Sequence, residues 1–380
     1  MLDRFFVPLV ILIVALLDIS PCHGESPCLQ AVELVKKGVQ IGDGSDGEVS
    51  LYNQAIQLCP QVVEAHFNLG LALQKRGDFA GAEGKLREAI KIKDDETFRV
   101  GLASVLLQKG EVSASQEHYE RVLQQNPKNV QALQGLAVIQ EKQQKLNEAI
   151  ETLRRAAACD ESNHLSFFNL GVLNEKSKLY DAAVVAYRRA SEINPKHFES
   201  KYFLGVVLTR QGSLEEARRA LQGAAEIRPD DVRVHLALGE VYEKLGEPAL
   251  AETALRRVAH MSPTNFIAQV NLGLLLTENK EYAEAISVLT KASTIDPKNA
   301  RVWSALGRAQ LELGQMSVAE VNLRQAVALD DSNAFAHNNL GVLLQRIGKK
   351  DEARAEFKTA LALNPDLEVA RKNLDVVGAE

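Results

Sequence analysis

Aromatic residues are scarce in this sequence of 380 residues, at 5%, and it has only four cysteines. It has no run of lysine and arginine, and its formal net charge is −6, so nucleic acid is not an expected partner. No Cys-x-x-Cys, His-x-x-x-His or His-Glu-x-x-His spacing occurs, and no glycine-rich phosphate loop follows a strand pattern. The sequence therefore predicts no metal site and no cofactor.

What the chain does have is a pattern that recurs every 34 residues, as in residues 164–197. There Leu170, at the seventh position, precedes the small Gly171; Ala183 follows twelve positions later, and the large Tyr187 four positions after that. Glycine in a central turn and proline near the end of most repeats are typical of two short helices and their stops. Because one such hairpin cannot bury its own apolar face, the repeats are expected to stack.

This pattern resembles the tetratricopeptide repeat family over about four-fifths of the chain. The resemblance implies an all-α, right-handed superhelical solenoid of antiparallel helix pairs. We number as repeats 2 to 10 the segments 63–95, 96–129, 130–163, 164–197, 198–231, 232–265, 266–299, 300–333 and 334–367. Repeat 3 departs most from the pattern, with Arg99 at an aromatic position and Ser115 at the alanine position, so we expect it to be the least stable interior repeat.

Residues 25–62 read as a degenerate first repeat, here repeat 1, with a long loop over Ile41–Gly47. Ser45 and Asp46 break the alternation of carboxylates that a calcium loop requires, so a flexible glycine-rich turn is the better interpretation. Residues 368–380 read as a C-terminal capping helix, with Val369, Leu374 and Val377 on its apolar side.

Residues 1–24 have the order of a secretory signal peptide, because Arg4 precedes an apolar run and small residues lead to Gly24. An uncleaved segment that anchors the chain in a membrane through residues 5–19 is an alternative, and a lipid on Cys22 is a weaker one. The sequence thus predicts an exported protein of the periplasm, the secretory lumen or the extracellular space. Membrane contact is expected only through an uncleaved N-terminal segment.

Cysteine placement fits that expectation. Cys28 begins the first helix of repeat 1 and Cys59 ends the second, and these ends are neighbours in an antiparallel hairpin. We predict a Cys28–Cys59 disulfide that holds the terminal repeat together; two buried, reduced cysteines are the alternative. Cys159 is expected to be a small buried apolar residue.

The sequence offers no catalytic constellation. His66, His235 and His337 occupy the fourth position of their repeats, which Phe167 and Trp303 also occupy, so they are interpreted as packing residues. We therefore predict that the protein is not an enzyme.

In the resembling family the first helix of each repeat lines a concave groove. The resemblance places these groove residues at the fifth and ninth positions: Phe67, Phe168, Val172, Tyr202, Val206, Leu236, Val270, Leu274 and Arg308. Those from Phe168 to Leu274 would form an apolar strip for a peptide or helix; the alternative is that close winding buries them. No repeat pairs a basic fifth position with asparagine at the ninth, which disfavours acidic chaperone tails.

Asparagine at the sixth position resembles repeats of O-linked glycosyltransferases, where it binds a peptide backbone. It occurs at Asn68, Asn169, Asn271 and Asn339, so the row is interrupted. The expected function is a non-catalytic adaptor that binds a protein or peptide segment in the groove. An assembly scaffold that uses self-association or its convex face, and a recognition subunit of a separate modifying enzyme, remain alternatives.

Overall fold

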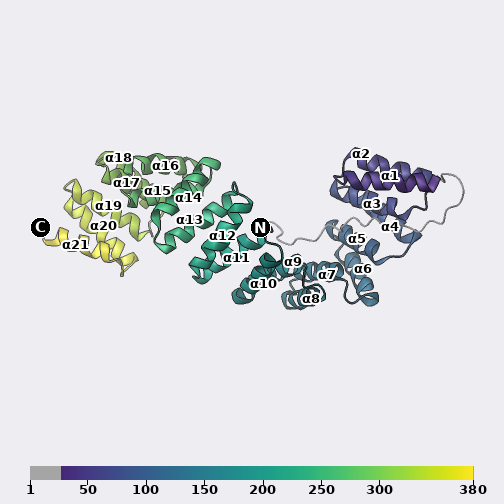
Figure 1. Ribbon diagram of the computed structural model, residues 1–380. Helices are drawn as coiled ribbons and strands as arrows, with labels where there is room; N and C mark the ends of the chain where they lie inside the picture. The colour runs from purple at the N-terminus through teal and green to yellow at the C-terminus, as the bar shows by residue number, and fades with distance from the viewer. Residues whose placement is uncertain (1–26, 380) are drawn as a thin grey trace. The chain divides into compact units, whose positions relative to one another are not determined.

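The computed structural model describes residues 27–379, in which all regular elements are helices (Figure 1). The predicted signal peptide, the alternative anchor over residues 5–19 and Cys22 lie outside the described residues. The chain divides into two compact units, which we call the N-terminal unit (described residues 27–207) and the C-terminal unit (described residues 208–379). Each unit is described by itself.

The helices of the N-terminal unit are α1 (Pro27–Ile41), α2 (Asp46–Leu58), α3 (Val63–Lys75), α4 (Phe79–Ile92), α5 (Glu96–Gln108), α6 (Val112–Gln125), α7 (Val130–Lys142), α8 (Leu146–Cys159), α9 (His164–Lys176), α10 (Tyr180–Ile193) and most of α11 (Phe198–Gln211). Those of the C-terminal unit are α12 (Leu214–Ile227), α13 (Val232–Leu245), α14 (Pro248–Met261), α15 (Phe266–Glu278), α16 (Tyr282–Ile295), α17 (Ala300–Glu312), α18 (Met316–Leu329), α19 (Ala334–Arg346), α20 (Lys350–Leu363) and α21 (Glu368–Ala379). Odd-numbered helices are the first helices of repeats and even-numbered ones the second, so the fold is the all-α solenoid of helix pairs that the sequence predicts.

Polar caps and left-handed turns set the ends of these helices. Asn163 caps α9 by accepting hydrogen bonds from the backbone N–H groups of Leu165 and Ser166, and Asn333 caps α19 in the same way. In the turn after the first helix, glycine takes a positive φ, as predicted, at Gly77, Gly110, Gly212, Gly246, Gly314 and Gly348. Gln144, Lys178 and Lys280 take the same conformation where glycine is missing.

The two helices of a pair approach closely where the eighth position is small. A Cβ atom at Gly171 would lie 2.5 Å from Cδ1 of Tyr187, so only glycine lets this ring pack against α9. Ala183 and Tyr187 are both 0% exposed, as the recurring pattern of small and large residues predicts. The core of each unit therefore runs between the helices of successive pairs.

Repeat 1 differs from the sequence-based expectation in its loop. The predicted long loop over Ile41–Gly47 is reduced to Gly42–Ser45, because α1 extends to Ile41 and α2 begins at Asp46. Ser45 accepts a hydrogen bond from the N–H of Glu48, and the buried Glu48 carboxylate accepts from the N–H of Gly44 and from Tyr52. This arrangement is close to a capping box, which the Ser45-x-x-Glu48 spacing could have indicated.

The capping helix α21 packs through the predicted residues Leu374 and Val377, but with Ala370 in place of the predicted Val369. Val369 is exposed, while Ala370 and Val377 are buried and Leu374 is half-buried. The buried set follows the spacing i, i+4 and i+7, which places Ala370, Leu374 and Val377 on one side of a helix. Within residues 27–379, no helix combines the length and the apolar character that crossing a membrane requires.

Candidate functional site

The predicted groove residues of the N-terminal unit are largely buried. Phe67 and Phe168 are each 1% exposed, and Val172 is buried as well. The Phe67 ring lies 4.8 Å from that of Phe98 in the next repeat, and the Phe168 ring lies 6.0 Å from that of Phe203, also in the next repeat. These three residues are buried, as the alternative interpretation expects, and the two phenylalanine rings contact the neighbouring repeat.

Tyr202 and Val206 on α11 are half-buried, so part of each side chain stays open to a partner. The Tyr202 ring stacks on Phe198 at 5.9 Å between centroids, and Phe203 packs against its edge at 5.1 Å. These contacts hold one side of the ring in place.

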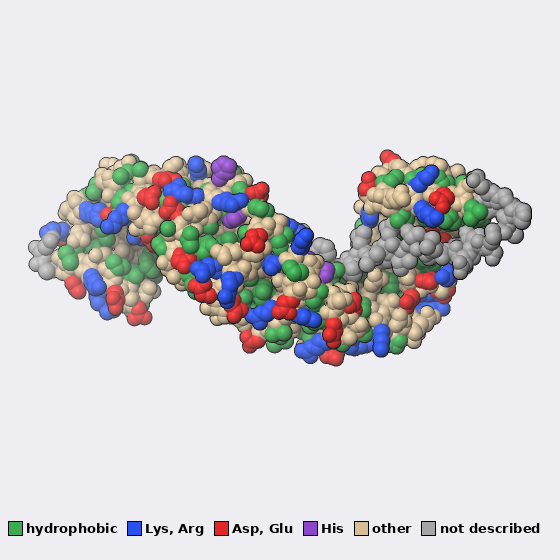
Figure 2. Space-filling model, in the orientation of Figure 1, with side chains coloured by type: hydrophobic (Ala, Val, Ile, Leu, Met, Phe, Trp, Pro, Cys, Tyr) green, Lys and Arg blue, Asp and Glu red, His purple; other side chains and the backbone are tan. Residues whose placement is uncertain are grey.

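In the C-terminal unit the predicted groove residues differ in exposure: one is buried, two are half-buried and one is exposed. Val270 is buried beside Ala292 and Val302, and Leu274 packs at the edge of this cluster. Leu236 and Leu274 are half-buried, and Arg308 is exposed. On the face that Figure 2 shows, acidic and basic side chains intermingle with hydrophobic ones.

A cavity of about 500 Å³ lies on three successive first helices of the C-terminal unit, α13, α15 and α17. Its lining includes Leu274, the predicted groove residue, and Asn271, the asparagine at the sixth position. Glu243, Glu278 and Arg301 add charged groups to the same lining. The structure thus combines apolar side chains, an amide and charges of both signs in one depression, as peptide-binding sites do.

Negative charge is concentrated around Glu243 in this cavity. Partial burial, followed by the negative charges of Glu278 and Glu240, raises the pKa of Glu243. The nearby Arg301 opposes that rise. A cationic group of a partner would compensate the same charges.

The four asparagines at the sixth position differ in their surroundings. Asn68 and Asn169 are buried, and Asn339 donates a hydrogen bond to Ser304 Oγ at 3.1 Å. Of the four, Asn271 is the one in the cavity lining. A row of backbone-binding amides is therefore not available within either unit.

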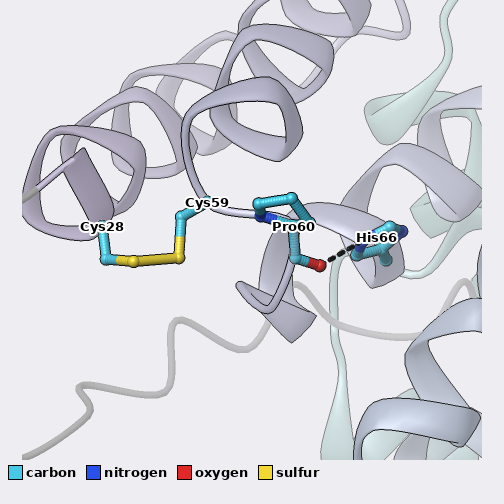
Figure 3. The surroundings of a disulfide bond; sticks show 4 residues. All are labelled: Cys28, Cys59, Pro60 and His66. Atoms are coloured by element: carbon cyan, nitrogen blue, oxygen red, sulfur yellow. Dashed lines mark hydrogen bonds between the residues drawn. A yellow bond between two sulfur atoms is a disulfide. The ribbon is translucent and has the colours of Figure 1, made fainter.

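Cys28 and Cys59 form a disulfide in the structure, with 4.9 Å between their Cα atoms (Figure 3). The next residue, Pro60, accepts a hydrogen bond from His66 Nε2 at 3.0 Å, which links the end of repeat 1 to α3. Cys159 is exposed, so the expectation that it is buried is wrong. It is the last residue of α8.

The fourth position of the repeat carries a hydrogen bond that the sequence analysis missed. Its side chain donates to the carbonyl six residues earlier, in the turn between repeats. This occurs at His66, His235, Gln269, Trp303, His337 and Arg371. Different residue types donate the same hydrogen bond at this position. A comparison of the side-chain donors at each position of the repeat could therefore have revealed this bond. No group of His, Cys, Asp and Glu side chains in the described part of the chain is arranged to hold a metal ion.

Comparison with known families gives matches that together cover more than half of the chain. Models described as TPR repeat or tetratricopeptide repeat match residues 49–77, 100–164, 165–197, 205–246, 236–300, 300–333 and 334–367. Among proteins with curated functions, none matches the sequence.

Several solved structures resemble parts of the chain. The MamA 41-end fragment from Desulfovibrio magneticus RS-1 is 26% identical and covers 45% of this chain and 96% of its own, with a TM-score of 0.42. The pilF protein of Pseudomonas aeruginosa is 19% identical and covers 55% of this chain and 96% of its own, with a TM-score of 0.49. The APC/C Cut9–Hcn1 hetero-tetramer is 12% identical over 93% of this chain and 98% of its own, with a TM-score of 0.47.

Proposed function

The chain belongs to the tetratricopeptide repeat family, whose repeats build protein-interaction modules, and from this premise we propose that it is a non-catalytic adaptor that binds a partner segment on its first helices. The observation that carries this proposal is the cavity on α13, α15 and α17 in the C-terminal unit. The alternatives of a scaffold and of a recognition subunit predict different partners in the experiment below.

The cavity suits an extended peptide because its polar and apolar side chains can pair with the backbone and side chains of such a segment. The Asn271 amide can donate to a backbone carbonyl and accept from a backbone N–H. Leu274 and Leu275 offer apolar surface, and Glu243 and Glu278 would attract a lysine or arginine of the partner. Arg301 would fix the register of the segment through a carboxylate or a carbonyl.

We propose further that the adaptor works in an exported compartment. The Cys28–Cys59 disulfide supports this proposal, because such bonds persist in oxidising compartments and are rare in the cytosol. Sequencing the N-terminus of the natively produced protein tests it. A start near residue 25 is expected, and an intact Met1 on protein recovered from the cytosol would overturn the proposal.

The binding proposal is tested by quantitative co-purification from the natural source with mass spectrometry. The variant carries Asn271→Ala and Arg301→Glu, and the control carries Arg257→Glu, the same charge change on the second helix α14. A partner that the wild type and the control retain and the variant loses is the expected result, with folding checked by circular dichroism. If the retained partner is an enzyme, the chain is its recognition subunit.

Equal recovery of every partner by the wild type, the variant and the control would contradict binding in this cavity. Binding through the second helices or through self-association would then account for the partners.

A further inference from the structure

A second cavity, of about 660 Å³, lies in the N-terminal unit over α8, α9 and α10. We call it the repeat-5 cavity, and it is lined by Arg154, Phe167, Leu170, Asn174, Ala182, Val185, Ala186, Arg188, Arg189 and Glu192. Most of these residues belong to α10, a second helix, and the groove residues Phe168 and Val172 are not among them. The cavity is therefore separate from the proposed first-helix site.

At two positions beside this cavity, repeat 5 holds apolar residues where repeats 3 and 10 hold a polar pair. In repeat 3, Arg99 and His118 lie 3.4 Å apart at these positions. In repeat 10, His337 and Glu356 lie 2.6 Å apart at the same positions. Their counterparts in repeat 5 are Phe167 and the short Ala186, which cannot form a hydrogen bond across the gap.

Leu170, an apolar residue of the cavity lining, is more exposed than its equivalents in repeats 3 and 10. Leucine at this seventh position is 1% exposed at Leu102 and 2% exposed at Leu340, but Leu170 is half-buried. Val185 is 64% exposed beside it. At the seventh position the cavity thus leaves leucine surface uncovered that repeats 3 and 10 bury.

Asn174 adds a polar group that has no partner. It is 2% exposed, and its Oδ1 makes no hydrogen bond to any described residue. In repeat 9 the equivalent Gln310 accepts a hydrogen bond from Asn322 at 2.6 Å, but the counterpart of Asn322 in repeat 5 is Ala186. A buried amide oxygen without a partner costs free energy, which an inserted N–H donor would recover.

The rim of the cavity is positively charged, although the whole chain carries a net charge of −6. Arg154, Arg188 and Arg189 face a single lining carboxylate, Glu192. The Arg189 guanidinium lies 5.9 Å from the centre of the Phe167 ring and 3.5 Å from Glu192. Arg154 pairs with Glu151 across 3.7 Å, and both side chains are exposed, so solvent screens this pair and a partner can replace it.

We propose that the repeat-5 cavity binds an acidic protein segment that inserts a large apolar side chain. The inserted side chain packs on Phe167, Leu170 and Val185, and a backbone N–H beside it donates to Asn174. Flanking carboxylates of the segment bind the rim arginines, which suit carboxylates because their planar donors bond two oxygens at once. Most of this site's lining is on second helices and excludes the groove residues Phe168 and Val172, so it goes beyond the proposed function and would give the adaptor a second partner.

The test selects ligands from a display library of random short peptides on the full-length chain. Val185→Asp puts a repelling charge on the cavity floor, and Val321→Asp makes the same change at the equivalent position of repeat 9. Both valines are exposed, at 64% and 67%, so both variants are expected to fold. Selected peptides should carry a large apolar residue beside Asp or Glu, and Val185→Asp should weaken their binding about tenfold or more.

Further results support or overturn the proposal. The Val321→Asp variant and the Asn271→Ala, Arg301→Glu variant should bind the selected peptides as the wild type does, and added salt should weaken binding. No enrichment of acidic, apolar peptides, or equal affinity for Val185→Asp, would overturn the proposal. Peptides lost by the Asn271→Ala, Arg301→Glu variant instead would also overturn it, while supporting the first-helix site.

Discussion

At the scale of single residues, the hydrogen bond from the fourth position ties α3, α13, α15, α17, α19 and α21 to the turn before each of them. His235 Nε2 donates to the carbonyl of Pro229 at 2.7 Å, and Gln269 Nε2 does the same for Pro263 at 3.0 Å. A histidine that sequence reasoning interprets as packing thus has a defined donor role. Since glutamine performs this role one repeat later, it serves as a conservative replacement.

We predict that His235→Leu lowers the free energy of unfolding by about 1 kcal/mol, because the carbonyl of Pro229 loses its donor. His235→Gln should change it much less, because the glutamine amide can donate in the same way. Urea unfolding followed by circular dichroism measures both values. Equal loss in the two variants would show that the ring packs there rather than donates.

His118 carries a second residue-scale prediction, which concerns pH. Burial, followed by the positive charges of Arg99 and Arg87, lowers the pKa of His118 below its ordinary value. The unfolded chain therefore binds the proton more readily, so this stabilising effect is complete above about pH 6.5 and is lost as pH falls through the lowered pKa. His118→Gln, which stays neutral, should remove this part of the pH dependence.

Melting temperatures of the wild type and His118→Gln at about pH 7.5 and about pH 5.5 measure the effect. The melting temperature of the wild type is expected to fall more on acidification than that of the variant. The same loss in both proteins would mean that groups other than His118 govern the acid response.

At the scale of repeats, departures from the pattern bring their own compensating contacts. Ser115 of repeat 3 replaces an alanine, but its Oγ donates to the carbonyl of Ala103 at 2.6 Å. The buried Arg99 pairs with Asp94 through two hydrogen bonds of 2.5 Å each. The low stability of repeat 3 relative to the other interior repeats stays a prediction. These contacts should make the difference in stability smaller than the sequence alone suggests.

Repeat 1 packs against α3 of repeat 2, and its disulfide joins the ends of its own two helices, so the bond should matter locally. The chain-entropy model gives the bond between Cys28 and Cys59, 31 residues apart in sequence, about 3 to 4 kcal/mol. We predict that Cys28→Ser with Cys59→Ser speeds hydrogen exchange in α1 and α2 and leaves the C-terminal unit unchanged. Cys159→Ser is the matched control.

Non-reducing mass mapping after alkylation of the native protein checks the pairing itself. The exposed Cys159 should be alkylated, while Cys28 and Cys59 stay joined. Alkylation of all three cysteines would favour the reduced alternative.

At the scale of the whole molecule, the contacts are local in sequence. The substantial helix–helix contacts among the described residues join helices that are consecutive or next but one in the chain. Stability is then close to a sum of repeat and nearest-neighbour terms. A destabilised repeat should therefore affect its neighbours and little else.

Gly171→Ala tests this. The added methyl would overlap Tyr187 and should cost about 1 to 3 kcal/mol. Hydrogen exchange should rise in α8 to α10 and stay unchanged in α16 to α21. Gly84→Ala, with nothing within 4 Å of the new Cβ, should instead stabilise α4 by about 0.5 to 1 kcal/mol. Faster exchange across both units in Gly171→Ala would show long-range coupling.

The sequence by itself determined the helix pairs, the left-handed turn glycines and the close approach at positions such as Gly171. These features depend on residues within one repeat, so the 34-residue period is enough to reveal them. The placement of Cys28 and Cys59 at adjoining ends of one hairpin follows from the same period. The predicted loop of repeat 1 was too long, because the local capping signal of Ser45 and Glu48 was missed.

Only the tertiary structure decided which side chains of the stacked repeats stay open. Phe168 and Val270 occupy groove positions but are buried, and Cys159 is exposed, because the neighbouring repeat determines what is covered. The repeat-5 cavity has the same origin, since it depends on the absence of a polar pair between Phe167 and Ala186 and on the arginines that two helices bring together. Periodicity fixes where a side chain lies on its helix, and packing between repeats fixes whether a partner can reach it.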